Sequence, residues 1–214
     1  MEIIKVNLST DWKNQEIIQK AVTTIKRNGS LVYPTDTVYA LGVDALKIHC
    51  MERLFKLKKR PETKPVPVMV WDIEMAKKLA FVSKKTEKIL EAVWPGPVTV
   101  VLEKRGIAPD VLTAGKRTIG LRIPDCRFVQ TLMAHLGEPI TATSANFSGS
   151  PPLSSAREII EIFSQSYPRP DLILDAGQLP ASKPSTVLDL TGQGPKILRV
   201  GPTSKKDLLK FLKT

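Results

Sequence analysis

Hydrophobic residues follow two patterns along this chain, and together the patterns predict alternating helices and strands. In residues 10–28 apolar residues recur every three or four positions, which predicts an amphipathic helix that Asp11 caps and Asn28-Gly29 ends. Further helices are predicted over residues 47–59, 72–80, 84–93, 126–136 and 154–164, and in a last segment that follows a cap at Thr203 or Ser204 and carries Lys210 and Lys213 in its last turn. Short apolar runs predict strands over residues 30–33, 66–71, 98–102, 119–123, 140–143, 172–175, 186–190 and 196–200.

The order of these elements indicates the fold class. Strands interleaved with helices are typical of an α/β fold. The strands near the C-terminal end follow one another closely with Gly-rich turns between them, which predicts some antiparallel pairing and hence a mixed sheet. The chain has 214 residues and contains no repeat and no Gly/Ser linker, so we expect a single domain over residues 1–214.

Composition and charge indicate the kind of partner. Apolar residues make up 42% and charged residues 25%, as in an ordinary soluble globular protein. The 32 Lys and Arg residues against 21 Asp and Glu residues give a formal net charge of +11, which favours a polyanion such as a nucleotide or nucleic acid. A solvated cationic surface without any partner would give the same charge.

Several functional classes are disfavoured by what the sequence contains. Cys50 and Cys126 lie far apart without a CxxC spacing, so neither a disulfide nor a thiolate metal site is expected, and a reducing cytosol fits. His49 and His135 are better explained as structural or surface residues, so we predict no metal site. No apolar run approaches 18 residues and no signal-peptide core begins the chain, which predicts a cytoplasmic protein that does not contact a membrane.

Cationic residues are placed where they could hold phosphate. The sequence lacks the P-loop and Rossmann glycine patterns, so side chains would have to grip a nucleotide. Residues 58–65 contain four cations and two prolines that stiffen the backbone, although a cationic helix C-terminus explains the same residues. Arg122 and Arg199 lie in predicted apolar strands, where a cation is expected to line a cleft.

Hydroxyl and amide side chains gather at three predicted strand ends. They occur in residues 139–149, in the turn over residues 34–42, and at Ser185-Thr186. Buried hydroxyls and amides need hydrogen-bond partners, so this density suits a ligand site better than a core. In the turn, Thr35 or Asp36 could instead cap a helix. Together with the arginines, the three segments predict one cleft lined by strand ends that binds a phosphate-bearing small ligand.

Seven short motifs give the chain a resemblance to the YrdC-like family, whose best-known members are threonylcarbamoyl-AMP synthases. In order, they are YPTDTVY at residues 33–39, KKRP at 58–61, WPGPVT at 94–99, GLRIP at 120–124, TSANFSG at 143–149, STV at 185–187 and LRVG at 198–201. The K-x-R and S-x-N signature of the family falls on Lys58, Arg60, Ser144 and Asn146. The motifs extend over nearly the whole chain, and their order is more specific than any one of them.

The resemblance implies both a fold and a reaction. The fold is a twisted mixed parallel and antiparallel sheet, flanked by helices, that encloses a deep cationic cleft. The reaction is a nucleotidyl transfer in which L-threonine, bicarbonate and ATP give L-threonylcarbamoyladenylate and pyrophosphate, with Mg²⁺ on the phosphates. A partner tRNA threonylcarbamoyl transferase then uses the adenylate to make threonylcarbamoyladenosine in tRNA. The basic surface leaves binding of tRNA or double-stranded RNA open.

The resemblance also implies roles for individual positions. The residues that would contact L-threonine are Thr37, Arg122, Ala142 and Ser185. The residues that would contact ATP are Arg60, Lys64, Thr118, Ser144, Pro152 and Arg199. The catalytic set would be Lys58, Arg60, Ser144 and Asn146, acting by positioning and by electrostatic stabilisation rather than as nucleophiles.

Two alternatives to the synthase remain open. Residues 51–53 and 116–120 resemble a sister branch of the family, which binds nucleotide or RNA without robust synthase activity, and Met69 follows the segment where many synthases have a histidine. That branch usually loses the S-x-N element, which this chain retains. A plain RNA-binding module is the other alternative, and aromatic residues at 6% are few for base stacking.

Overall fold

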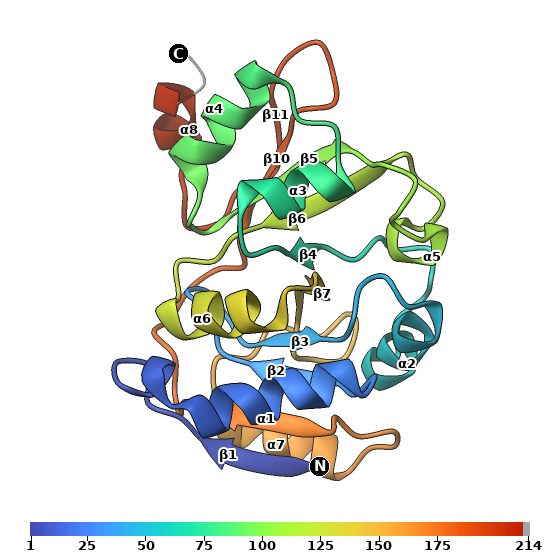
Figure 1. The fold of residues 1–214 in the computed structure, drawn as a ribbon, viewed down its shortest axis with the longest axis vertical. Helices are drawn as coiled ribbons and strands as arrows, with labels where there is room; N and C mark the ends of the chain where they lie inside the picture. Colours follow the sequence, from blue (N-terminus) through green and yellow to red (C-terminus); the bar gives the residue numbers. More distant parts are fainter. Residues whose placement is uncertain (212–214) are drawn as a thin grey trace.

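The computed structural model describes residues 1–211, in which helices and strands alternate along the chain (Figure 1). The helices are η1 Asp11–Lys13, α1 Gln15–Lys26, α2 Ile48–Lys58, α3 Ile73–Leu79, α4 Lys84–Val93, α5 Asp110–Thr113, α6 Arg127–Leu136, α7 Ala156–Ser164 and α8 Lys205–Phe211. The strands are β1 Glu2–Lys5, β2 Leu31–Tyr33, β3 Ala40–Gly42, β4 Val68–Met69, β5 Val98–Glu103, β6 Thr118–Arg122, β7 Ile140–Thr141, β8 Thr143–Ser144, β9 Leu172–Asp175, β10 Thr186–Asp189 and β11 Lys196–Arg199. The predicted α/β class is confirmed.

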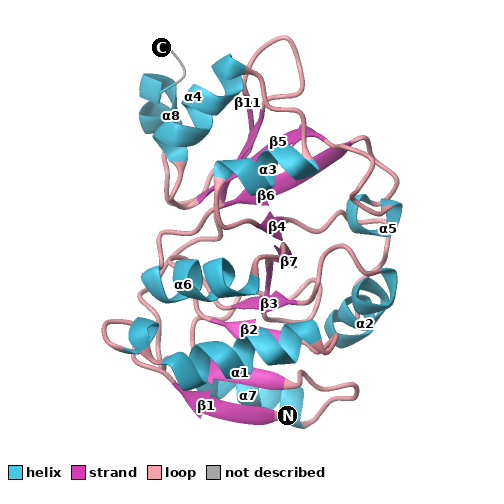
Figure 2. Cartoon of the chain, viewed as in Figure 1, coloured by secondary structure: helices cyan, strands magenta, loops and turns pink. Residues whose placement is uncertain are grey.

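The strands form two mixed sheets, which lie one above the other in Figure 2. The five-stranded sheet has the order β1-β9-β2-β3-β8, with β9 parallel to both β1 and β2 and the other pairs antiparallel. The six-stranded sheet has the order β11-β10-β5-β6-β4-β7, with β10–β5 and β4–β6 parallel and the remaining pairs antiparallel. The expected mixture of parallel and antiparallel pairing is present, but in two sheets rather than one.

The chain passes from one sheet to the other within residues 140–144. β7 pairs with β4 in the six-stranded sheet, and β8 pairs with β3 in the five-stranded sheet. Between them, the backbone amide of Ala142 donates to the carbonyl of Pro67 at 2.8 Å, and the amide of Thr141 donates to the carbonyl of Val43 at 2.9 Å. This crossing places the hydroxyl-rich segment that follows β8 at the junction of the two sheets.

The five-stranded sheet is covered by helices on both faces, with Leu31 in the cluster of α1 and α6 and Val32 in the cluster that includes residues of α7. In the five-stranded half, Ile18 and Ile25 of α1 pack in one cluster with Phe128 and Leu132 of α6, and all four side chains are fully buried or nearly so. Figure 1 shows α1 and α6 side by side over these strands. Burying a side chain of this size contributes about 1.5–3 kcal/mol each, so the apolar face that the sequence predicted for residues 10–28 fixes the helix to the sheet.

The start of that helix differs from the prediction. The segment splits into η1 and α1, and α1 begins after Asn14, whose side-chain oxygen accepts from the amides of Glu16 at 3.2 Å and Ile17 at 3.3 Å. Asp11, the predicted cap, instead accepts from the amide of Asn7 at 2.8 Å. Both residues are good caps, and the preceding turn decides between them.

Other elements were missed or predicted too long. The sequence did not indicate β1, β3 and α5, all of which are four residues or shorter. The strand predicted over residues 140–143 is divided into β7 and β8. The strand predicted over residues 66–71 shrinks to β4, because Pro65 and Pro67 have no amide hydrogen to donate to a neighbouring strand. The last helix begins after Ser204, whose hydroxyl accepts from the amide of Asp207 at 3.2 Å, whereas Lys213 lies outside the described residues.

Two simpler expectations can be compared with the described part of the chain. Cys50 and Cys126 are both buried and both free, in agreement with the prediction that they form no disulfide. Among residues 1–211, no helix combines the length and the apolar character that crossing a membrane requires.

Candidate functional site

A cavity of about 570 Å³ lies against the face of the six-stranded sheet that its helices leave uncovered. Side chains alternate between the two faces of a strand, so in β5 Val98, Val100 and Leu102 enter the core while Thr99 and Val101 line the cavity. The same alternation places Thr118, Gly120 and Arg122 of β6 and Val187 and Asp189 of β10 on the cavity side. We predicted a cleft lined by strand ends; much of the lining is instead a sheet face.

The structure brings all the predicted site residues into this one lining. They are Thr37, Lys58, Arg60, Lys64, Thr118, Arg122, Ala142, Ser144, Asn146, Pro152, Ser185 and Arg199. Their individual roles stay predictions, since proximity does not assign a contact to threonine or to ATP. His49 and His135 are absent from the lining of this cavity.

The lining is rich in positive charge. Its cationic side chains are Lys58, Arg60, Lys64, Lys116, Arg122 and Arg199, and its one acidic side chain is Asp189. Such a balance raises the local concentration of anions and stabilises them when they are bound. The geometry therefore suits an anionic ligand. Sequence reasoning singled out neither Lys116 nor Asp189.

Lys58 connects helix α2 to the segment after β8. It is the last residue of α2, because Lys59 adopts a left-handed conformation with φ of 49°. The Lys58 side chain is 1% exposed, and its Nζ donates to the carbonyl of Ser144, to the carbonyl of Asn146 at 2.8 Å and to Oδ1 of Asn146 at 3.3 Å. Burial, with a smaller contribution from Arg60, lowers the pKa of Lys58 to about 7.

These contacts change the expected role of Lys58. We predicted that it binds a triphosphate, yet its three hydrogen-bond donors already have oxygen partners within the protein. The backbone amide of Ser148 also donates to the carbonyl of Lys58 at 2.8 Å. Lys58 therefore holds residues 144–148 against the end of α2, and phosphate binding remains a prediction for Arg60.

Ser144 and Asn146 contact each other. The Ser144 hydroxyl donates to Oδ1 of Asn146 at 2.6 Å, and Nδ2 of Asn146 donates to the carbonyls of Ser150 at 2.6 Å and Pro151 at 3.2 Å. The resemblance assigns both residues to the catalytic set, and both line the cavity. The Asn146 side chain also organises the loop from residue 146 to residue 151.

Arg122 is buried and held from three sides. Its Nε donates to the carbonyl of Gly96 at 3.0 Å, Nη1 donates to the hydroxyl of Thr37 at 3.0 Å, and Nη2 forms an ion pair with Asp36. An arginine has five N–H donors, so these three contacts leave two for a ligand. Arg122 as a whole residue is 6% exposed and lines the cavity. A ligand carboxylate that reached its guanidinium there would be bound strongly.

Asp36 is the functional candidate that sequence reasoning missed. We considered it only as a helix cap, but no helix follows it, and the cap-like bonds come from Thr35, whose hydroxyl accepts from the amides of Thr37 at 3.1 Å and Val38 at 3.3 Å. Oδ1 of Asp36 pairs with Arg122, and Oδ2 is buried without a hydrogen-bond partner among the described residues. Only its position between two threonines in the YPTDTVY motif could have indicated this role.

Arg199 and Ser185 form a second held pair. Nε and Nη2 of Arg199 donate to the carbonyl of Ser185 at 3.0 and 2.8 Å, and the Ser185 hydroxyl lies 2.8 Å from the hydroxyl of Thr99. The chain after Arg199 approaches closely at Gly201, where an added Cβ would overlap the carbonyl oxygen of Pro184. Glycine is therefore required there, and it brings the two segments of the cavity wall together.

Arg60 is partly buried and makes few contacts within the protein. Its Nη2 donates to the carbonyl of Pro65 at 2.9 Å, while its Nε is buried and has no partner in the described chain. Burial lowers the pKa of the guanidinium, which still remains charged. Lys64, which follows within the same turn, is exposed at the rim. These two residues have donors that an anionic ligand could use.

The cavity offers little to a metal ion on its own. Among residues 1–211 no three His, Cys, Asp or Glu side chains are grouped so that they could hold one. Oδ1 of Asp189 accepts from the amide of Thr191 at 2.9 Å and from its hydroxyl at 2.6 Å. Mg²⁺ is commonly held by one or two carboxylates together with substrate phosphates, so this donor set fits an ion that arrives with a nucleotide.

A mixed α/β fold with a cation-rich cavity on an uncovered sheet face defines a class of proteins that bind small anionic ligands. Residues 23–201 match the model of the Sua5/YciO/YrdC family, which carries the description Telomere recombination. The chain belongs to this family, as the motifs predicted.

Two relatives and one solved structure place the chain within the family. It is 34% identical over 203 residues to the threonylcarbamoyl-AMP synthase of Pyrococcus abyssi, covering 94% of this chain and 58% of the relative. It is equally 34% identical over 200 residues to the uncharacterized protein YciO of Escherichia coli, covering 93% of this chain and 96% of that one. The crystal structure of P. abyssi Sua5 complexed with L-threonine matches with a TM-score of 0.90 and 33% identity, covering 99% of this chain and 61% of that chain.

The coverage differs between the two relatives. The chain spans somewhat over half of the P. abyssi synthase but nearly all of YciO. The identity is the same in both cases, so it does not favour one relative over the other.

Proposed function

We propose that this chain is a threonylcarbamoyl-AMP synthase, a nucleotidyltransferase that converts L-threonine, bicarbonate and ATP into L-threonylcarbamoyladenylate and pyrophosphate. The observation that carries the proposal is that a single cavity contains every residue that the family resemblance assigns to threonine, to ATP and to catalysis. A relative named threonylcarbamoyl-AMP synthase and a related structure described with L-threonine support it.

Threonine would bind beside Arg122. The two free N–H donors of this guanidinium can receive the amino-acid carboxylate, while Asp36, Thr37 and Gly96 keep the side chain in place. The Ser185 hydroxyl, held by Thr99, lies in the same lining and can contact the polar groups of threonine. Ala142 adds a small apolar contact there.

ATP would bind toward the Arg60 side of the cavity. Arg60 and Lys64 have donors left for phosphate, and Arg199 adds a further cation across the lining. Ser144, Thr118 and Pro152 complete this part of the wall. Mg²⁺ would enter with the triphosphate as part of the substrate, with Asp189 as the one carboxylate of the lining that could reach it.

The chemistry needs positioned charges more than a reactive side chain. The threonine nitrogen attacks the carbon of bicarbonate to give a carbamate and water; with CO₂ formed from bicarbonate, the same attack gives the carbamate and a proton. A carbamate oxygen then attacks the α-phosphorus, and the bond to the bridging oxygen breaks so that pyrophosphate leaves. Bicarbonate, ATP, the carboxylate of threonine and the carbamate are all anionic, so bound cations that bring them together lower the barrier. The product would pass to a transferase that modifies tRNA in the cytoplasm.

The test is direct formation of the adenylate. The protein is incubated with ATP, Mg²⁺, bicarbonate and L-threonine, and threonylcarbamoyladenylate is measured by mass spectrometry alongside released pyrophosphate. We expect both products to require all three substrates and to appear in equal amounts. Isotopically labelled bicarbonate should place its carbon in the adenylate. ATP breakdown that continues without threonine would contradict the proposal.

A second candidate is a nucleotide- or RNA-binding protein without robust synthase activity. The resemblance of residues 116–120 to the sister branch favours it, and the equally similar YciO is named only as an uncharacterized protein. This candidate predicts binding without adenylate formation. RNA binding to the basic surface would also weaken steeply as salt rises, whereas pyrophosphate release would change much less.

A further inference from the structure

The three tryptophans of the chain meet at a second cavity, separate from the first. Trp12, Trp71 and Trp94 all line this groove of about 730 Å³, which shares no lining residue with the cavity described above. Its walls are α3 and α4 on one side and η1 and α6 on the other, so it follows the boundary between the two halves of the molecule (Figure 1).

The charge of this groove is opposite to that of the molecule. Asp72, Glu74 and Glu91 line it against a single cation, Arg127, in a chain whose net charge is +11. Glu74 forms an ion pair with Lys77 at 2.7 Å, so the acids of the lining without an ion pair in the described residues are Asp72 and Glu91. Glu91 is exposed, and its carboxylate has no ion pair or hydrogen bond within the described residues. An acidic lining repels the phosphates of nucleic acid and attracts a cationic partner.

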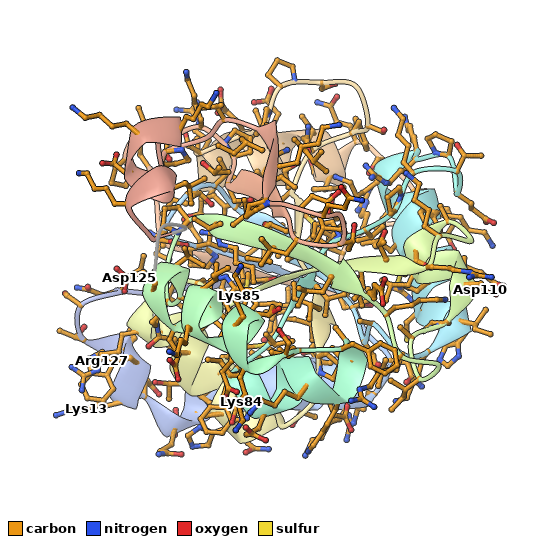
Figure 3. All side chains as sticks on the ribbon, turned by 90° about the horizontal axis from the view of Figure 1, so that it is seen from above. Lys13, Lys84, Lys85, Asp110, Asp125 and Arg127 are labelled. Atoms are coloured by element: carbon orange, nitrogen blue, oxygen red, sulfur yellow. The ribbon has the colours of Figure 1, made fainter. Side chains whose placement is uncertain are left out.

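The groove already contains the contact that such a partner would make. The guanidinium of Arg127 stacks on the ring of Trp12, with 3.6 Å from its central carbon to the ring centroid, and Lys13 lies 4.8 Å from the same ring. Figure 3 shows Lys13 and Arg127 together at this edge of the molecule. Trp71, by contrast, is 44% exposed, and no cation stacks on its ring in the part of the chain that the structure describes.

We infer that the groove binds a basic peptide segment of a protein partner, with an arginine side chain stacked on Trp71 and close to Glu91. Cation–π stacking and an ion pair would recognise the guanidinium. Ile73, Ile123 and Pro95 provide apolar surface for neighbouring residues of the segment. A free cation would lack this second contribution, and Trp and Arg are both enriched among the residues that contribute most to binding at protein interfaces.

The tryptophans make the inference easy to test, because every indole in the chain lines the groove and none lines the first cavity. An acetylated, amidated pentapeptide with arginine between two leucines is titrated into the full chain while tryptophan emission is recorded. The matched peptide has citrulline, which keeps the shape of arginine without its charge. We expect a saturable change with the arginine peptide and at least about fivefold weaker binding of the citrulline peptide.

Variants check the position of the arginine. Glu91→Gln should weaken binding of the arginine peptide several-fold and leave the affinity for the citrulline peptide unchanged. Glu161 is an exposed acid on α7, and Glu161→Gln should change neither affinity. Trp71→Leu keeps the apolar area but loses the ring, so it should weaken arginine binding while Trp12 and Trp94 still report. Equal affinity for the two peptides, or a response to a single-stranded oligonucleotide but to neither peptide, would overturn the inference.

Discussion

Lys58 and Asn146 lie 88 positions apart in the sequence, and the ammonium group of one donates to both the carbonyl and the side-chain oxygen of the other. The K-x-R and S-x-N parts of the family signature are therefore one structural unit. A buried ammonium needs oxygen atoms that accept its hydrogen bonds, and the carbonyls of a loop outside helices and sheets need hydrogen-bond donors. The two parts of the signature therefore meet each other's hydrogen-bonding requirements. Arg60 and Ser144 are positioned on either side of this contact.

The depressed pKa of Lys58 should make stability depend on pH. Its folded pKa of about 7 is below the ordinary 10.5, so between these values the unfolded chain binds more protons than the folded chain. The contribution of Lys58 to the unfolding free energy therefore rises with pH in this window, by at most about 1.4 kcal/mol per pH unit. Lys58→Met removes the titrating group, so urea unfolding at pH 7, 8 and 9 should show a gap between wild type and variant that widens with pH.

Other titratable groups do not affect the difference in unfolding free energy between wild type and Lys58→Met. The shifts of Lys47, Lys77 and the buried tyrosines are shared by both proteins and cancel in the difference. Parallel profiles for wild type and Lys58→Met would mean that the three oxygens around Nζ keep the ammonium charged throughout.

Asn146→Ala should destabilise the protein as well as inactivate it. Alanine at 146 leaves the Ser150 and Pro151 carbonyls without a donor and removes an acceptor from Lys58. The unfolding free energy should fall by about 2–4 kcal/mol, and Ser144→Ala should cost about 1 kcal/mol. Denaturant titration of both variants measures the two losses.

Local sequence predicted which face of each element is buried, and it could not predict which distant residues meet. The apolar face of α1 follows from a 3.6-residue period, and the alternation in β5 follows from a two-residue period. The contact of Asp36 with Arg122 joins positions 86 apart, and neither the turn nor the strand contains a local signal for it. The crossing between sheets at residues 140–144 depends equally on distant partners, so one sheet was expected where two exist.

The motifs predicted more of the site than periodicity did. Each motif is short, yet the order of the motifs predicted twelve residues that the structure brings into one cavity. What they could not give is how those residues contact one another. Lys58 and Asn146 were assigned to the catalytic set, which stays a prediction, and the structure adds that their hydrogen bonds also support the loop.

Arg60→Ala should weaken ATP binding. Its partly buried guanidinium has an unpartnered Nε and few protein contacts, so a phosphate would gain a charge-assisted hydrogen bond there. The loss should be about 1–3 kcal/mol, or roughly 5- to 150-fold in dissociation constant. Calorimetry with a non-hydrolysable ATP analogue measures it, with Arg117→Ala, an exposed arginine outside the cavity lining, as the control. Unchanged affinity would remove Arg60 from the nucleotide site.

Asp36→Asn should raise the KM for threonine, although we do not expect Asp36 itself to contact a substrate. The amide keeps the size of the side chain but loses the charge that orients Arg122, so the guanidinium should sample positions from which it binds a carboxylate poorly. We expect the KM for threonine to rise several-fold, with a smaller change in the KM for ATP. Asp125→Asn is the matched control, since Asp125 is exposed at the edge labelled in Figure 3. Equal effects on both substrates would indicate a general structural role for Asp36.

Arg122→Lys should raise the KM for threonine more than any other conservative substitution in the cavity lining. Lysine has three donors on one atom, so it cannot keep the contacts to Gly96, Thr37 and Asp36 and still bind a carboxylate with two parallel hydrogen bonds. Losing one such contact should raise the KM for threonine about tenfold or more, at roughly 1.4 kcal/mol per factor of ten. Steady-state kinetics with threonine and with ATP varied separately measure the two effects.

Threonine amide separates carboxylate recognition from other causes. It lacks the negative charge, so it should be a poor substrate for the wild-type protein and should lose little further activity in Arg122→Lys. Arg117→Lys controls for the substitution itself at an exposed position. If Arg122→Lys raises the KM for ATP and leaves threonine unaffected, Arg122 belongs to the phosphate site, and the two free N–H donors of its guanidinium face the nucleotide instead.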